Sequence, residues 1–417
     1  MKKNGLFVSM VIAIGFTVAT LMSCSDVNTV EDPQFRADGF LLKDLYTSDT
    51  FSIVNPTKIK YYVEVSGSMN GFFRPNQPTQ FKTDVWGLMS YFSALPSEVT
   101  ILTNNGSIGS RMSIDEFRKH MNTGSFISSA STQVPIMLSS IVDDIKPDKG
   151  EVAVLISDMK YSPVGVAAPK VLMEQYSSDV SRILGHFGKP VSLVSAISNY
   201  LAKKEEVLES PYYFFVLGNE GEVAYMRNSI STLLDNNGHF IDNIESGFNY
   251  GAPQYSFGIP EYCYQLDEEP TFVDFDESAS DTCVVDLKVD LAKYRWIVAD
   301  TTIFKNSFKC KALYGSNVSV GDVKIEVSNI TEKKLNRTAI ANVKLKLYDL
   351  AMDSEVIEWS LELPDLNDSK FRRFYGANSE NDYTKSFSIE SFLQGIFYGG
   401  VVNKTLKPNF ILISKNS

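Results

Sequence analysis

KIKYYVEVSGSM, residues 58–69, joins a run of β-branched and aromatic residues to a turn that is rich in side-chain oxygens. Branched and aromatic side chains favour extended backbone, so Lys58 to Val65 is predicted to be a strand. A second run, Val152 to Ile156 (VAVLI), is apolar at every position. Such a run is typical of a strand buried on both faces of a sheet. We therefore expect the two runs to be central neighbours in one parallel sheet.

The chain from Lys58 to about Asn236 alternates between such runs and segments with helical spacing of apolar residues. Ser113 and Glu116 have the spacing of a capping box, and Thr83 is predicted to cap the first helix. The further predicted strands are Val99–Leu102, Val191–Ile197 and Tyr212–Leu217, and the predicted helices follow Thr83 and Ser113 and span Val134–Ile145, Val171–Phe187 and Glu222–Leu234. Strands interleaved with helices predict a doubly wound α/β domain with a mostly parallel sheet, placed at residues 56–240.

The pattern changes after about Phe240, where Gly and Pro cluster and short polar–apolar alternations follow. Alternation with turn residues between the runs predicts a mainly antiparallel β-sandwich at residues 241–417. Its predicted elements are the strands Val284–Leu291, Val320–Val327, Ala341–Leu347, Val356–Leu363 and Phe410–Ile413, with one helix at Ser388–Tyr398.

The N-terminus has three parts: Lys2 and Lys3, the apolar stretch Gly5 to Leu21, and the sequence Leu21-Met22-Ser23-Cys24. An apolar run this short behind two lysines favours a signal peptide over a permanent membrane span, which needs roughly 20 apolar residues. The site before Cys24 resembles the lipobox of bacterial lipoproteins. That resemblance implies cleavage of residues 1–23, acylation of Cys24, and attachment to the bacterial cell envelope by lipid alone, at the periplasmic or surface face of the outer membrane.

Residues 24–55 are polar and lack periodicity, so they are predicted to form a tether. Scattered acids in this segment, such as Asp26 and Glu31, resemble the surface-export signals of Bacteroidetes lipoproteins. Cleavage before Cys24 would remove two lysines and no acids, which takes the net charge from −11 to −13 over the remaining 394 residues. An acidic chain of this kind argues against nucleic-acid binding.

Three cysteines follow Cys24, namely Cys263, Cys283 and Cys310, so at most one intramolecular disulfide can form among them. Which pair would form it stays open. The three histidines are far apart and no Cys-x-x-Cys pair is present, which makes a zinc site of Cys and His improbable.

Five oxygen-bearing side chains form the candidate site. Glu64, Ser66 and Ser68 lie where the first strand is predicted to end, and Asp158 lies directly after the VAVLIS run. Thr132 precedes the predicted helix at Val134–Ile145. In an open parallel sheet, ligands bind at the carboxyl ends of the strands. Carboxylate and hydroxyl oxygens without His or Cys suit a hard cation such as Mg²⁺, Mn²⁺ or Ca²⁺.

An acid-x-Ser-x-Ser-Met turn, a later Thr before a helix and an Asp after an apolar strand resemble a von Willebrand factor type A domain. The resemblance spans roughly residues 58–236 and implies a metal-ion-dependent adhesion site with Glu64, Ser66, Ser68, Thr132 and Asp158 as ligands. It implies Mg²⁺ as the first choice of ion, a protein partner that supplies a carboxylate to the metal, and no catalysis. The family normally begins the motif with Asp, and this chain has Glu64. Ser131 could also replace Thr132 as the hydroxyl ligand.

Two other functions remain open at this stage. A metal-dependent hydrolase of phosphate or sulfate esters would use Asp158 and Glu64 as ligands, although no base accompanies Ser66 or Ser68. A glycan-binding surface lipoprotein would use the C-terminal sandwich. Ordinary structural roles also explain each residue singly, because Ser-Gly-Ser is a common turn and Asp a common helix cap. Phe72 and Phe73 either line the binding face or pack at the edge of the core.

Overall fold

The structure is a computed structural model that describes residues 51–103, 108–126, 132–161, 169–202, 205–258, 263–265, 272–276, 280–294, 301–329, 335, 337–350, 354–362, 370–376, 382–399 and 406–416. The predicted signal peptide, the predicted acylation site Cys24, and Ser131 lie outside the described residues, as does all but the end of the predicted tether.

A seven-stranded sheet forms the centre of the N-terminal part, in the order β3-β2-β1-β4-β6-β5-β7. Its strands are β1 (Lys58–Glu64), β2 (Ser97–Leu102), β3 (Ile108–Met112), β4 (Glu151–Ser157), β5 (Val191–Leu201), β6 (Glu206–Leu217) and β7 (Phe240–Ser246). Strand β1 lies between β2 and β4 and runs parallel to both. The predicted central pairing of Lys58–Val65 with Val152–Ile156 is therefore confirmed.

Both edges of the sheet depart from the predicted parallel pattern, and at one of them β3 pairs antiparallel with β2. Strand β6 pairs antiparallel with both β4 and β5, and β7 pairs antiparallel with β5. Only residues 202–205 separate β5 from β6. A connection of four residues is too short for a crossover helix, so the two strands form a hairpin that inserts β6 between β4 and β5.

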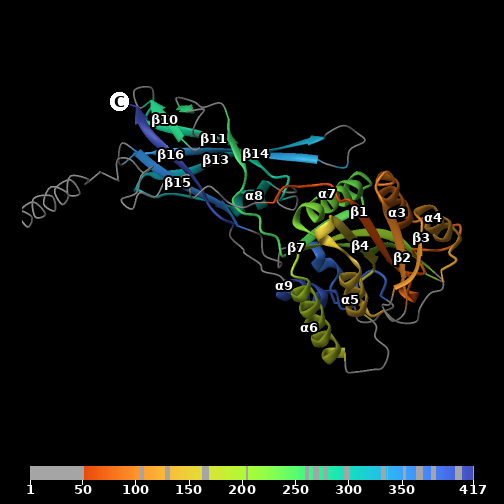
Figure 1. The fold of residues 1–417 in the computed structure, drawn as a ribbon. Coiled ribbons are helices and arrows are strands. Elements are labelled where there is room, and N and C mark those ends of the chain that lie inside the picture. The colour runs from red at the N-terminus through yellow and green to blue at the C-terminus, as the bar shows by residue number, and fades with distance from the viewer. Residues whose placement is uncertain are drawn as a thin grey trace, which may run out of the picture.

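Helices cover both faces of this sheet, as expected for a doubly wound fold (Figure 1). One face carries α3 (Gln80–Tyr91), α4 (Ile114–Thr123) and α7 (Glu220–Asn236), and the other carries α5 (Val134–Asp144), α6 (Pro169–Phe187) and α9 (Ile389–Gly399). Adjacent residues of β1 point to opposite faces, so Tyr61 packs in the first core and Tyr62 in the second. Both residues are fully buried.

Of the two predicted helix caps, one is confirmed and the other is wrong. Ser113 caps α4, and its hydroxyl accepts the backbone N–H of Glu116, as predicted. The prediction that Thr83 caps the first helix is wrong. Helix α3 begins one turn earlier, and Thr79 is its cap, accepting the N–H of Lys82. The apolar spacing of Val85 and Leu88 marks the buried face of the helix but leaves the position of its first turn open.

The C-terminal part contains two facing β-sheets. The five-stranded sheet has the order β12-β15-β16-β10-β9 and the four-stranded sheet the order β13-β14-β11-β8. Their bounds are β8 (Tyr255–Phe257), β9 (Cys263–Gln265), β10 (Phe272–Asp276), β11 (Thr282–Asp290), β12 (Phe308–Ala312), β13 (Asn317–Asn329), β14 (Arg337–Tyr348), β15 (Ser354–Leu361) and β16 (Asn409–Asn416). Tyr255 of one sheet meets Trp359 of the other edge to face, with ring centroids 5.2 Å apart. All described pairings are antiparallel except β10 with β16.

The predicted division at residue 240 does not follow the observed packing. Strand β7 begins at Phe240 and completes the seven-stranded sheet. Helix α9 and the 3₁₀ turn η4 (Lys370–Phe374) come from the C-terminal part, yet Phe371, Phe392 and Ile396 are buried in the core beneath α5 and α6. The chain therefore leaves the α/β unit, builds most of the sandwich, returns to cover the sheet with α9, and ends in the sandwich with β16 (Figure 1).

A buried ionic contact joins the two parts. Arg227 of α7 is fully buried, pairs with Glu245 of β7 and donates a hydrogen bond to the carbonyl of Lys293 at 3.0 Å. Its neighbour Asn228 donates to the carbonyl of Ala292 at 3.0 Å. These bonds attach the segment after β11 to the α/β unit. Breaking them would be strongly unfavourable, because an unpaired guanidinium or carboxylate at this depth is costly.

The remaining predictions on the described residues concern membrane contact and cysteines. No helix within the described part of the chain is both long and apolar enough to cross a membrane. Cys283 is buried on β11, and Cys310 is a half-buried free thiol on β12 in the opposite sheet.

The contact between α6 and α9 depends on a glycine. A Cβ added at Gly395 would lie 2.6 Å from Cβ of Val180 and 2.8 Å from the carbonyl oxygen of Ser177. We predict that Gly395→Ala lowers the free energy of unfolding by about 2 kcal/mol through overpacking. Gly87 is the matched control, because a Cβ there would make ordinary contacts of 3.5 Å or more with Leu233. Gly87→Ala should instead stabilise helix α3, by up to about 1 kcal/mol.

Urea denaturation of the two variants tests this prediction. An increase in stability for both substitutions would contradict the docking of α9 on α6.

Candidate functional site

The five predicted site residues converge at one edge of the sheet. Glu64 is the last residue of β1, and Ser66 and Ser68 follow on the turn that contains η1 (Gly67–Met69). Asp158 follows β4, the parallel neighbour of β1. Thr132 precedes helix α5 and, like Glu64, Ser66 and Asp158, is no more than 2% exposed. Ser68 is half-buried. Parallel pairing of β1 and β4 produces this convergence, because their carboxyl ends meet at the same edge.

Hydroxyl groups surround the Glu64 carboxylate. Thr132 donates its hydroxyl proton to Oε1 at 2.9 Å, and Ser157 donates to Oε2. The hydroxyls of Ser66 and Ser68 lie 2.8 Å apart and are hydrogen-bonded to each other. Residues that are 68 and 93 positions from Glu64 thus contact the same carboxyl group.

The Asp158 carboxyl has one oxygen without a partner. Its Oδ1 accepts the backbone N–H of Lys160 at 3.2 Å, whereas Oδ2 is buried and has no hydrogen-bond partner among the described residues. Buried carboxylate oxygens are normally satisfied by donors or by a cation. The lone Oδ2 of Asp158 therefore marks a place where a ligand of positive charge would be stabilised.

Burial dominates the electrostatics of both acids. It raises the pKa of Glu64 to about 7, and repulsion from Asp158 adds to that shift. Hydrogen bonds from Ser157, Ser66 and Thr132 act in the opposite direction. Burial also raises the pKa of Asp158, while the charge of Lys160 and contact with Ser68 oppose the rise. Two carboxyl groups this close and this deeply buried repel each other when both are ionised.

These residues fit a divalent cation of the hard class. The donor set consists of carboxylate and hydroxyl oxygens, and it includes an unsatisfied, buried carboxylate oxygen. Glu64, Ser66, Ser68, Thr132 and Asp158 would hold the ion. It would neutralise the carboxyl pair and offer a free coordination position to an anionic group of a partner. Within the described residues, no three His, Cys, Asp or Glu side chains gather as a metal-binding group, which is consistent with a set made largely of hydroxyls.

Three further residues of this environment were not predicted from the sequence. Ser157 stands directly before Asp158, so its place at the end of a buried strand was a usable signal. Lys160 is two residues further on and only 3% exposed. Ser386 donates its hydroxyl proton to the carbonyl of Asp158 at 3.2 Å from 228 positions away, and no local pattern announces that contact.

The aromatic residues near the motif belong to the core. Phe72 is 1% exposed and Phe73 is 5% exposed. Phe72 meets Tyr200 edge to face at 5.0 Å between ring centroids. Of the two roles left open for these phenylalanines, the structure therefore supports packing within the core.

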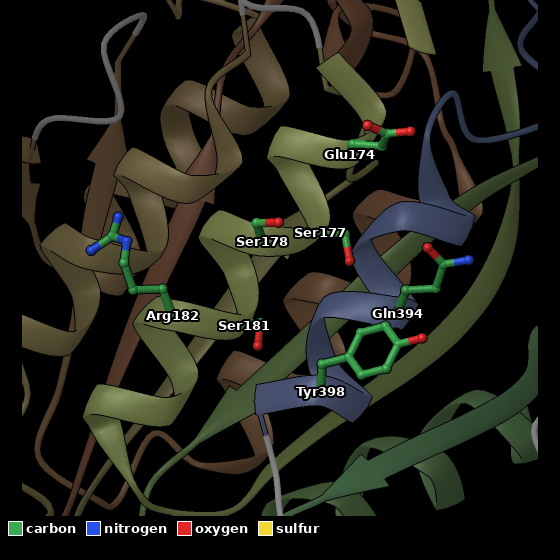
Figure 2. Close-up of a pocket in the computed structure, with 7 residues that line it drawn as sticks. All are labelled: Glu174, Ser177, Ser178, Ser181, Arg182, Gln394 and Tyr398. Carbon is green, nitrogen blue, oxygen red and sulfur yellow. The ribbon is translucent and has the colours of Figure 1, made fainter. Parts of the chain in front are cut away.

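A groove of about 490 Å³ lies elsewhere, between α6 and α9, and is lined by polar side chains. Figure 2 shows Gln394 and Tyr398 of α9 beside Ser177 and Ser181 of α6. Glu174, Ser178 and Arg182 complete the lining. Tyr398 is 78% exposed. Glu174, Gln394 and Tyr398 are all exposed, so their polar groups face solvent.

Comparisons with models of protein families, with curated proteins and with solved structures found no match to this chain. The structure itself defines the class as a mixed α/β protein with a seven-stranded central sheet and further, mainly antiparallel sheets. Its likeness to the von Willebrand A family stays a prediction from the motif.

The raised pKa of Glu64 predicts a pH dependence of stability in the metal-free protein. The folded carboxyl has a pKa of about 7, above the ordinary 4.5 of the unfolded chain, so the folded state binds more protons between these values. The contribution of Glu64 to the free energy of unfolding should therefore be greatest below about pH 4.5 and should fall as the pH rises to about 7. The change is on the order of 3 kcal/mol.

Urea denaturation in EDTA at several pH values, comparing wild type with Glu64→Gln, measures this contribution. The Gln variant should lose most of the decline between pH 5 and 7.5, since its side chain does not titrate. The same slope in both proteins would show that Glu64 is not the titrating group.

Proposed function

We propose that the chain is a lipid-anchored envelope protein that binds a protein partner through a divalent cation held by Glu64, Ser66, Ser68, Thr132 and Asp158. The observation that carries the proposal is the meeting of three separate segments at one sheet edge around two buried carboxyl groups. The unpartnered Oδ2 of Asp158 supports a cation as the missing member. Mg²⁺ is the ion expected first, with Mn²⁺ and Ca²⁺ as alternatives.

Adhesion or complex assembly fits this donor set better than hydrolysis. Two of the three histidines bond with residues outside the candidate site. His239 bonds with Asp84, and His120 bonds with Ser125. The Ser66 hydroxyl is bonded to Ser68, and no hydrogen bond joins either serine to a basic side chain within the described residues. The site supplies oxygen ligands and charge, which suit capture of a carboxylate from a partner. The lipid anchor, the outer-membrane location and the protein partner follow from the two resemblances.

Removal of one hydroxyl ligand tests the metal site. We predict that Ser66→Ala weakens Mn²⁺ and Mg²⁺ binding at least about tenfold, because the ion loses a ligand that no neighbouring group replaces. Calorimetric titration of the chain beginning at Ser25 measures the affinity, and circular dichroism checks the fold. Ser178→Ala on the exposed side of α6 is the matched control and should leave the affinity unchanged.

Partner binding should follow the metal. In capture from envelope extracts, EDTA and Ser66→Ala should each remove the same protein, and Ser178→Ala should retain it. Absence of metal binding to the wild-type chain would rule out the proposal.

A second candidate function is glycan binding, favoured by the groove between α6 and α9. An exposed phenol ring offers a flat apolar surface, and the hydroxyl, amide and carboxylate groups around it offer both donors and acceptors. Glu174 and Arg182 bring both signs of charge, so a neutral polysaccharide fits better than a charged one. The sequence had pointed to the sandwich for this role, and the groove lies on the α/β unit instead.

Affinity electrophoresis in neutral polysaccharides tests this candidate. Tyr398→Ala should abolish any retardation of the wild-type chain, whereas EDTA and Ser66→Ala should leave it unchanged. Retardation that persists in Tyr398→Ala would exclude the groove.

A further inference from the structure

A short C-terminal segment, Asp382–Ser388, lies against the loop that follows β4. Its residue Ser386 is fully buried and donates its hydroxyl proton to the carbonyl of Asp158. Tyr213 of β6 bonds to the same hydroxyl at 2.9 Å. A serine has one proton to give, so Tyr213 is the donor in that second bond. The segment is thereby bonded to the backbone of a predicted metal ligand.

Lys160 connects the same segment to the carboxyl pair. Its ammonium donates a hydrogen bond to the carbonyl of Asp382 at 3.4 Å and lies 4.6 Å from the ring centroid of Tyr383. The ring of Tyr383 in turn stacks on Tyr200, with 4.3 Å between centroids. An ammonium group over an aromatic face is stabilised by the ring quadrupole, more so away from water. At 3% exposure, Lys160 is almost wholly removed from solvent.

Access to the candidate site is narrow in this arrangement. Glu64, Ser66, Thr132 and Asp158 are each no more than 2% exposed, so a partner's carboxylate could not reach an ion there without movement. Lys160 supplies positive charge close to Asp158, which is the role that a divalent cation would take over. Two cations near one carboxyl group repel each other, so they compete for it.

We propose that Lys160 and the segment Asp382–Ser388 form a latch that closes the site in the metal-free protein, and that a divalent cation displaces Lys160 and releases the segment. This inference rests on the proposed function, because it names how the same site opens. The ion would cancel the attraction of Asp158 for the Lys160 ammonium, and the segment would lose its link to the site through Asp382 and Tyr383. Metal binding and opening are then coupled, and the coupling is reciprocal.

The test compares wild type with Lys160→Met in the chain beginning at Ser25. Methionine keeps much of the length of the side chain and removes its charge. Mn²⁺ should bind about tenfold more tightly to Lys160→Met, because no internal cation competes. Lys160→Arg keeps the charge and should resemble wild type, and Lys309→Met on the exposed face of β12 is the matched control.

Hydrogen exchange provides the second measurement. The amide of Ser386 is bonded to the carbonyl of Phe374 at 3.2 Å, so it reports whether the segment is docked. Mg²⁺ should speed exchange at this amide at least about tenfold in wild type. In Lys160→Met the amide should already exchange fast without metal. Tyr383→Leu changes a half-buried residue and should act like Lys160→Met, which keeps the test valid if Lys160→Met fails to fold.

The possible results distinguish failure of the latch proposal from failure of the metal-site proposal. If wild type binds Mn²⁺ but Lys160→Met and Tyr383→Leu bind it equally well, and Ser386 exchanges at the same rate with and without Mg²⁺, the latch is overturned and the metal site stands. If no variant binds Mn²⁺, both are overturned.

Discussion

The burial of two carboxyl groups side by side constrains the rest of this structure. Glu64 and Asp158 lie at the ends of adjacent parallel strands and are almost inaccessible to water. Transfer of an ionised carboxylate from water into a protein interior is strongly unfavourable unless donors or a cation compensate. Thr132 and Ser157 supply donors to Glu64, and Lys160 supplies charge near Asp158. The Oδ2 atom of Asp158 has no hydrogen-bond donor among the described residues, and a divalent ion would satisfy it.

The architecture explains how residues so far apart in sequence reach these two groups. Parallel pairing of β1 with β4 brings Glu64 and Asp158 to the same edge, and helix α5 begins there, just after Thr132. The hairpin of β5 and β6 places Tyr213 next to β4, from where its hydroxyl meets Ser386. The helices α6 and α9 cover the same face of the sheet as α5 and contact each other at the glycine at position 395. The same strands and helices therefore form the core and position the residues of the site.

The excursion of the chain into the sandwich separates the last site contacts in sequence from the rest of the α/β unit. The segment that contacts Asp158 and Lys160 follows strands β8 to β15 of the sandwich and precedes its last strand, β16. Arg227 and Asn228 of α7 attach the segment after β11, within that excursion, to the α/β unit. Covalent continuity and these buried contacts therefore connect the sandwich with the proposed latch. A single α/β domain without the sandwich would lack this connection.

The sequence alone determined the local elements and the residue types of the site. Apolar runs and helical spacing predicted the strands and helices because burial is periodic along each element, and the serines, Thr132, Glu64 and Asp158 were found because strand ends and oxygen ligands have local signatures. The N-terminal lipid anchor stays a prediction from the sequence. Tertiary structure decided what depends on contacts between distant segments: the antiparallel insertion of β6, the return of α9 across the predicted boundary at residue 240, and the approach of Lys160 and Ser386 to Asp158. No local pattern records such contacts, because the packing of whole elements, and not the periodicity within one of them, brings these side chains together.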